Sequence, residues 1–124
     1  MSRLPARIAG FGGVVLGAFG FSAMILPESF FDQLARFEPY NQHFIQDIGA
    51  FQIGLAAVLL LALRYSDSLA AGLLGAGVGS TAHVVSHAVG TELGGTPAVD
   101  IPVFAILSAV LLIGGFMRVG HRLF

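Results

Sequence analysis

Four long apolar segments dominate the sequence, at about 6–26, 42–64, 69–90 and 101–119. Each is close to the roughly 20 residues that an α-helix needs to cross the hydrocarbon core of a bilayer. Within that core a spanning segment must satisfy all of its backbone N–H and C=O groups, and a helix does so internally. We therefore expect an all-α integral membrane four-helix bundle, formed as a single membrane domain by residues 1–124.

The composition supports a membrane location and excludes several other classes of protein. Hydrophobic residues make up 56% of the chain and charged residues 10%, whereas soluble domains carry about 25% charged residues. Because the chain has no cysteine, disulfides, thiolate metal sites and cysteine nucleophiles are excluded. The six basic residues form no basic stripe, which excludes nucleic acid as a partner. The expected surroundings are a lipid bilayer.

The segment between the first two spans, residues 29–37, predicts a short helix that lies at the membrane interface. Ser29 with Asp32 has the form of a capping box, which satisfies backbone N–H groups at the start of a helix. One face of this helix is predicted to be apolar. That face carries Phe30, Leu34 and Phe37.

Polar residues also mark the starts of later spans. Asn41 precedes the second span, and Asp100, or Thr96 with Pro97 following, precedes the fourth. A side-chain oxygen at such a position accepts a hydrogen bond from the first N–H groups of the helix, and proline suits the first helical turn. We expect these residues to cap their spans.

Charged residues fall on opposite sides of the predicted bundle. The arginines on one side are Arg3, Arg7, Arg64, Arg118 and Arg122. The acidic residues on the other side are Glu28, Asp32, Glu38, Asp47, Glu92 and Asp100, and the exceptions are Arg36 and Asp67. Because arginines favour the cytoplasmic side, we expect a multi-pass protein of the inner (plasma) membrane with both termini in the cytoplasm.

Ionisable residues inside two of the spans form a candidate functional site. Asp47 lies about 7–8 Å below the outer end of the second span, and His87 and His83 lie about 5 and 10 Å below that of the third. These groups are therefore expected at the same depth. His43 shares a face with Asp47 because residues four apart on a helix are neighbours. Charged groups are costly in a bilayer, so Asp47 is expected to have a partner.

This arrangement predicts a metal site or, as a variant, a haem site. Two histidines four residues apart can chelate one ion, and a carboxylate from a neighbouring helix can complete the set. The expected ligands are Asp47, His83 and His87, supported by His43 or Glu92, and the expected cofactor is Zn, Fe, Cu or haem in a redox-related role. The sequence HVVSH lacks the glutamate of HExxH, so a zinc-protease mechanism is excluded.

Three other interpretations remain open. The Asp47–histidine pair can be a structural hydrogen bond that fixes helix register. Closely spaced small residues in spans one and three favour a homo-oligomer or an accessory subunit of a larger membrane complex. A third interpretation is a carrier or enzyme for an apolar small molecule that enters from lipid, with Asp47 and a histidine handling a proton. The candidate pocket residues are Phe11, Phe19, Phe21 and Phe51, and no catalytic residue is assigned.

Two stretches carry a resemblance to known proteins. NQHFIQDIGAFQIGLA in the second span and HVVSHAVG in the third resemble a pattern in small bacterial four-span membrane proteins of unknown function, which are similar to DoxX-like membrane proteins. The resemblance extends to spans one and four by hydropathy. It implies a four-helix membrane bundle, and it implies no particular reaction.

Overall fold

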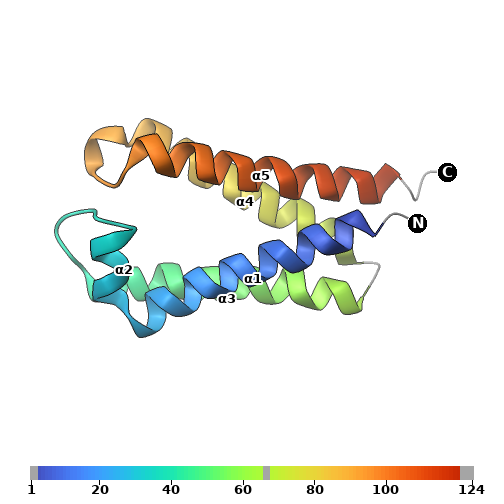
Figure 1. Cartoon of the computed structure of the whole chain (residues 1–124), viewed down its shortest axis with the longest axis horizontal. Helices are drawn as coiled ribbons and strands as arrows, with labels where there is room; N and C mark the ends of the chain where they lie inside the picture. Colours follow the sequence, from blue (N-terminus) through green and yellow to red (C-terminus); the bar gives the residue numbers. More distant parts are fainter. Residues whose placement is uncertain (1–2, 66–67, 121–124) are drawn as a thin grey trace.

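The computed structural model describes residues 3–65 and 68–120, and they form a helical bundle (Figure 1). Its helices are α1 (Leu4–Ile25), α2 (Pro27–Gln33), α3 (Gln42–Arg64), α4 (Leu69–Val89) and α5 (Pro97–Gly120), with a short 3-10 helix, η2 (Thr91–Leu93). Among the described residues, α1, α3, α4 and α5 are long and apolar enough to cross a membrane. The predicted all-α four-helix bundle is confirmed.

The start of the fourth span differs from the prediction. We expected this helix from residue 101, and α5 begins at Pro97. The backbone N–H of Thr96 donates a hydrogen bond to Oδ2 of Asp100 at 2.7 Å. The two residues offered as alternative caps therefore act together, and Pro97 occupies the first turn, where its missing N–H costs nothing.

The predicted capping box before the interfacial helix is wrong. Helix α2 begins at Pro27, after Leu26, and no side chain caps it. Ser29 lies inside the helix, where its hydroxyl accepts a hydrogen bond from Nε2 of Gln33 at 2.8 Å. Proline at the first position starts the helix two residues earlier than the Ser29 signal indicated. Phe30 of the predicted apolar face is buried, whereas Leu34 is exposed.

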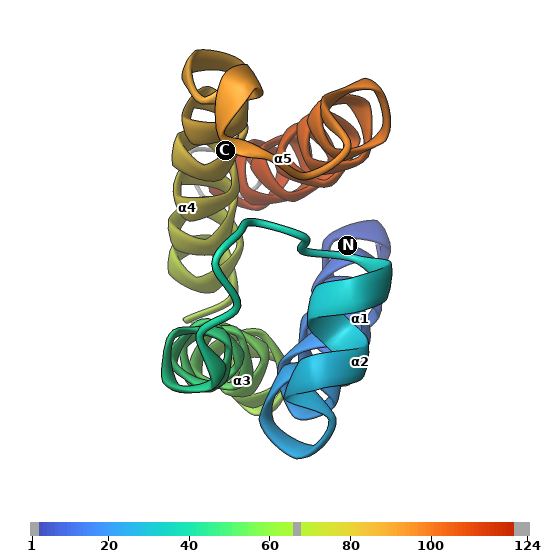
Figure 2. The ribbon, with the colours of Figure 1, turned by 90° about the vertical axis from the view of Figure 1, so that its left-hand side faces the viewer.

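The four long helices are arranged as two pairs. Helix α1 packs mainly on α3, and α4 packs mainly on α5. Figure 2 shows the two pairs end-on, with the segment between α2 and α3 passing across the space between them. The pairs share a buried core that includes Leu16, Leu59, Leu73 and Leu111. A second cluster, Ala23, Phe30, Phe31 and Ile45, joins α2 to the α1–α3 pair.

Helices α1 and α3 approach each other closely at two glycines. A Cβ atom on Gly20 would lie 2.8 Å from the carbonyl oxygen of Gly49, and a Cβ on Gly49 would lie 2.7 Å from that of Gly20. Both distances are shorter than any ordinary contact. Lipid tails are as apolar as leucine, so helices in a bilayer associate through close packing of this kind.

Helices α4 and α5 are joined by hydroxyl groups. The Oγ atoms of Thr81 and Ser108 are 2.6 Å apart. Both hydroxyls also lie within hydrogen-bonding distance of the Gly77 carbonyl oxygen, at 2.9 Å for Thr81 and 3.2 Å for Ser108. Ser108 is buried. These bonds therefore satisfy a hydroxyl group that would otherwise lack a hydrogen-bond partner between two apolar helices.

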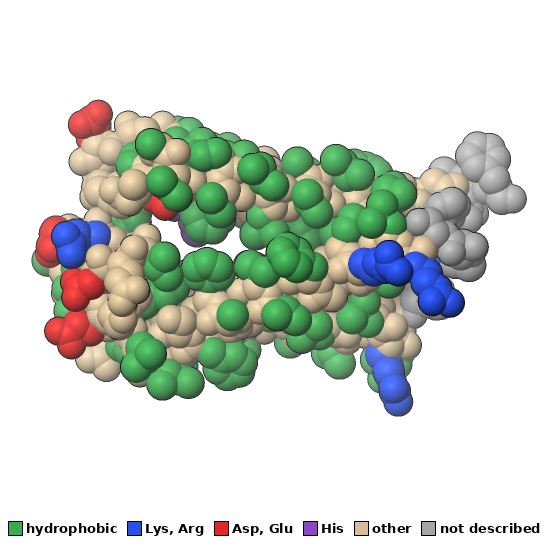
Figure 3. Space-filling view, viewed as in Figure 1, with side chains coloured by type: hydrophobic (Ala, Val, Ile, Leu, Met, Phe, Trp, Pro, Cys, Tyr) green, Lys and Arg blue, Asp and Glu red, His purple; other side chains and the backbone are tan. Residues whose placement is uncertain are grey.

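Charges separate to the two ends of the bundle (Figure 3). The acidic end, which is the end of α2 and η2, carries Glu and Asp side chains together with Arg36. The opposite, basic end carries Arg3 and Arg7 at the start of α1 and Arg64 at the end of α3. Asp67 and Arg122, which entered the prediction, lie outside the described residues. The predicted separation of charge along the bundle agrees with this arrangement.

Several glycines lie on the outside of the bundle. A Cβ atom on Gly54, Gly75 or Gly79 would meet no atom within 4 Å. The faces that carry them are available to lipid or to another protein chain. The homo-oligomer and the membrane-complex subunit stay predictions.

Candidate functional site

A cavity of about 960 Å³ lies between the two helix pairs. Most of its wall is apolar, and side chains from α1, α2, α3, α4 and α5 contribute to it. Its aromatic members are Phe11, Phe19, Phe30, Phe31, Phe37, Phe44 and Phe104. Phe11 and Phe19 were predicted to border an apolar pocket and do so, whereas Phe21 and Phe51 are not part of this wall.

The cavity opens toward the side of the bundle. Figure 3 shows a gap between the helix pairs in the half near the acidic end, and a histidine is visible inside it. Three cavity residues on α1 and α5 are accessible over more than half of their surface, at 67% for Phe11, 52% for Val103 and 66% for Ile106. The opening is therefore framed by apolar side chains at a depth where lipid would surround the protein.

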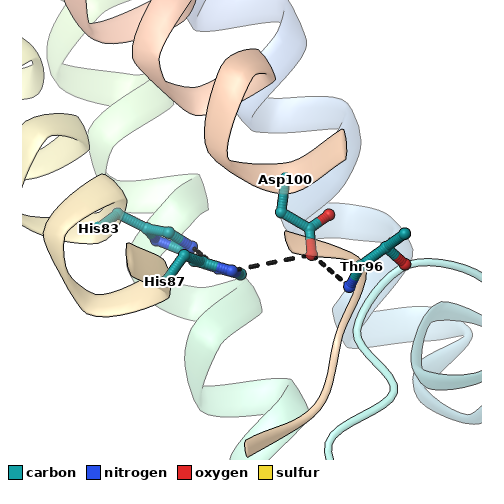
Figure 4. A network of polar contacts seen from close by, with 4 residues as sticks. All are labelled: His83, His87, Thr96 and Asp100. Carbon is teal, nitrogen blue, oxygen red and sulfur yellow. Dashed lines mark hydrogen bonds and ion pairs between the residues drawn. The ribbon is translucent and has the colours of Figure 1, made fainter. Parts of the chain in front are cut away.

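A chain of polar side chains forms one part of the cavity wall (Figure 4). The Nε2 atoms of His83 and His87 are 2.9 Å apart, within hydrogen-bonding distance. Nδ1 of His87 faces Oδ2 of Asp100 at 3.7 Å, and the side chains of these two residues are 13% and 14% exposed. The same Oδ2 accepts the hydrogen bond from the Thr96 N–H. We call His83, His87 and Asp100 the polar chain.

Helix geometry explains how these residues meet. His83 and His87 are four residues apart on α4, so their rings stack on one face of the helix, with centroids 4.8 Å apart and planes inclined by 14°. Asp100 lies in the first turn of α5, and the short connection through η2 brings that turn back beside the end of α4. Residues at adjoining ends of α4 and α5 therefore lie at the same depth.

Aromatic rings surround the two imidazoles. The ring of Phe104 lies 4.3 Å from that of His83 and 5.4 Å from that of His87, measured between centroids. Phe37, from the segment between α2 and α3, approaches His87 edge-on at 5.8 Å. These contacts leave the imidazoles few positions to adopt, so the polar chain is held in one arrangement.

Two glycines allow the connection that precedes α5 to pass close to Asp100 and Phe37. Gly94 and Gly95 have φ angles of +123° and +74°, which residues with a side chain rarely adopt. The N–H of Gly95 donates to the Arg36 carbonyl at 2.9 Å. A Cβ on Gly95 would lie 2.6 Å from Phe37 and 3.0 Å from Asp100. Glycine therefore allows the segment between α2 and α3 to close over this end of the cavity.

Gln52 of α3 adds a polar group elsewhere on the wall. It lines the cavity, and its Oε1 atom is buried without a hydrogen-bond partner among the described residues. Gln52 was not among the predicted ligands; the sequence left open whether it lines a cavity or bonds to a third helix. A buried amide oxygen without a partner loses free energy unless a ligand or water pairs with it.

The predicted pairing of Asp47 with the histidines of α4 is wrong. Asp47 instead faces His43 on its own helix at 3.6 Å, and both side chains are well exposed, at 54% and 87%. The inward face of α3 carries Ile45, Gly49 and Ala56. At 100° per residue Asp47 is turned about 200° from Ile45, so it lies on the exposed face of α3.

The predicted metal ligands are accordingly not assembled. Among residues 3–65 and 68–120, no group of three or more histidine, aspartate or glutamate side chains is placed to hold a metal ion. His83 and His87 do come together, but Asp47 and His43 form a separate pair and Glu92 is exposed in η2. Binding of a metal ion or haem stays a prediction.

Asp100 belongs to the candidate site, although it was predicted only to cap the fourth span. It was interpreted only as a helix cap, and it does bind the Thr96 N–H. The signal that it also meets His87 was present, because both residues flank the same short connection and so lie at similar depth. A carboxylate accepts several hydrogen bonds, so capping does not exclude a second contact.

The fold and the cavity together define the class of this protein. Its described residues form a helical bundle with four helices able to span a membrane and with a side-opening apolar cavity that ends at the polar chain. No protein-family model, curated protein or solved structure matches the chain. The similarity to DoxX-like membrane proteins stays a prediction.

Proposed function

We propose that this protein binds an elongated apolar small molecule, which enters from the bilayer and places a polar head group against His83. The observation that carries this proposal is the cavity of about 960 Å³ between the helix pairs. Ligand pockets typically have volumes of about 300–1,000 Å³, are mostly apolar, and contain a few polar groups that orient the ligand. The cavity has each of these properties.

The volume supports binding because protein interiors are normally close-packed. The core toward the basic end of the bundle illustrates this, since Leu59 and Leu73 are fully buried. The same helices leave space at the acidic end. An apolar space inside a bilayer is filled most favourably by an apolar molecule, because water there would find few polar partners.

The route of entry follows from the opening. Phe11, Val103 and Ile106 line the cavity and are more than half exposed. The gap between the helix pairs opens at the side of the bundle (Figure 3), so a molecule dissolved in lipid would reach the cavity without passing through water. Toward the acidic end, the hydrogen bond from Gly95 to Arg36 and the contact of Phe37 with His87 close the cavity. Entry from the side is therefore the open route.

Binding of 4-nonylphenol tests this function. This compound has an apolar tail and a phenol head group, and we expect it to bind saturably to the protein in lipid nanodiscs, at about one molecule per chain. The measurement is the amount of 4-nonylphenol retained after rapid gel filtration, quantified by mass spectrometry. Empty nanodiscs of the same lipid measure partition into the bilayer. An uptake that rises linearly and equals that of empty nanodiscs would contradict the proposal.

The proposed setting is the inner (plasma) membrane, with both termini in the cytoplasm. The arginines at the basic end support this orientation. Because the chain has no cysteine, single cysteines report it directly. We expect Glu92→Cys to react with a membrane-impermeant maleimide on intact cells, and Arg64→Cys to react only after the cells are opened. The reverse pattern would show the opposite orientation.

A further inference from the structure

Asp100 determines which ring nitrogen of each histidine in the polar chain carries the hydrogen atom. Asp100 Oδ2 lies 3.7 Å from Nδ1 of His87, longer than a hydrogen bond but close enough for charge to matter. A carboxylate only accepts hydrogen bonds. A bare nitrogen lone pair facing it would be repelled, so His87 carries its hydrogen on Nδ1 and leaves Nε2 as an acceptor.

The tautomer of His83 follows from that of His87. Because His87 Nε2 accepts, the Nε2 atom of His83, 2.9 Å away, must donate. A neutral imidazole has one N–H group, so with both rings neutral the Nδ1 atom of His83 keeps a free lone pair. None of the described residues forms a hydrogen bond to that atom. His83 lines the cavity, so its unpaired nitrogen is an acceptor for a ligand.

We infer that the ligand of this cavity carries a hydroxyl group and donates its hydrogen to Nδ1 of His83. This inference rests on the proposed function and specifies the chemical class of the ligand. An ether, an ester or a ketone offers acceptors alone and would leave two acceptors facing each other. The preferred class is an apolar alcohol or phenol. Asp100 and His87 are positioning residues, since they act on the ligand through the His83 ring.

A matched pair of probes tests the preference. 4-Nonylphenol has a hydroxyl group, and 4-nonylanisole replaces it with a methyl ether. We expect the protein in nanodiscs to bind the phenol about tenfold more tightly, because the ether leaves the histidine nitrogen unpaired. Each probe is referenced to its own uptake by empty nanodiscs, so that different partition into lipid cancels.

Variants of the two positioning residues test whether the polar chain sets this preference. In Asp100→Asn the amide oxygen can accept the Thr96 N–H where Oδ2 does now, so an acceptor still faces His87 and the preference should persist. Asp100→Leu removes this acceptor, and His87→Phe removes the ring nitrogens that orient His83. In both of these variants His83 can adopt either tautomer, so we expect the ratio of the two affinities to fall toward one.

The outcomes separate the inference from the proposed function. If neither probe binds above empty nanodiscs, the proposed function fails and the inference fails with it. If both probes bind equally to the unaltered protein, the cavity is confirmed as a binding site and the hydroxyl preference is refuted. A preference that persists in full in both Asp100→Leu and His87→Phe also refutes the inference. If Asp100→Leu does not fold, His87→Phe alone decides this last point.

Discussion

Replacing Ile48 and Val103 together by tryptophan is expected to weaken the binding of 4-nonylphenol by about tenfold or more. The two residues line the cavity from α3 and α5, on opposite helix pairs. Neither belongs to the buried core clusters, so the larger rings can enter the cavity without displacing the core. They occupy space that the apolar tail needs, and binding is lost while the fold is kept. The measurement is the nanodisc assay described above.

A matched double variant controls for the tryptophans themselves. Phe51 on α3 and Ile113 on α5 are 78% and 56% exposed, and neither lines the cavity. Changing both to tryptophan adds two indole rings to the same two helices on their outer faces. We expect this variant to bind 4-nonylphenol like the unaltered protein. Equal binding by both double variants would mean that the probe does not occupy the cavity.

Replacing Gly49 by leucine is expected to separate α1 from α3 and to destabilise the protein by about 1–3 kcal/mol. The first atom of the new side chain would already lie 2.7 Å from the Gly20 carbonyl oxygen and 3.0 Å from the Ala23 side chain. A backbone carbonyl cannot rotate away as a flexible side chain can. The helices must therefore move apart, and the close packing that joins them in a bilayer is lost.

Thermal stability in detergent measures this effect, as the temperature at which half of the monodisperse protein is lost on gel filtration. Gly54 supplies the control, because a Cβ on this residue of the same helix meets nothing within 4 Å. We expect Gly49→Leu to lower that temperature by several degrees and Gly54→Leu to leave it nearly unchanged. Because leucine favours a helix more than glycine does, a similar loss in both variants would show that the added side chain itself, and not the close packing at Gly49, is responsible.

The spans were predictable because the physics that defines them is local. A run of about 20 apolar residues needs a helix to satisfy its backbone in lipid, and no tertiary contact alters that requirement. The start of α5 was less predictable. Thr96 and Asp100 each looked like a cap on their own, and their mutual hydrogen bond places the start four residues earlier than expected.

The candidate site depended on helix rotation, which the sequence constrains weakly. Depth along the bilayer was estimated from the rise per residue, and that estimate puts Asp47 level with His83 and His87. Depth does not specify which way a side chain points. In lipid an outward face need not be polar, so hydrophobic periodicity gives little information on rotation. The glycine contact between α1 and α3 sets the rotation of α3 and directs Asp47 outward.

The pairing of His87 with Asp100 was easier to predict from the sequence than the direction of the Asp47 side chain. The connection between α4 and α5 is short, so the last turn of one helix must lie beside the first turn of the next. A polar residue in each turn then has a partner at hand. We interpreted Asp100 only as a cap because helix starts favour carboxylates, and this local explanation was correct but incomplete.

The unequal joining of the two helix pairs has a mechanical consequence. Near the basic end they share leucine packing, whereas at the acidic end they are linked by the Gly95–Arg36 backbone hydrogen bond and the Phe37 ring. A rotation of one pair against the other about these leucines would change the width of the space between the pairs. His83 and Asp100 both belong to the α4–α5 pair. Under the proposed function, such a rotation would therefore keep the contacts to the head group of a ligand and would fit the cavity to apolar tails of different width.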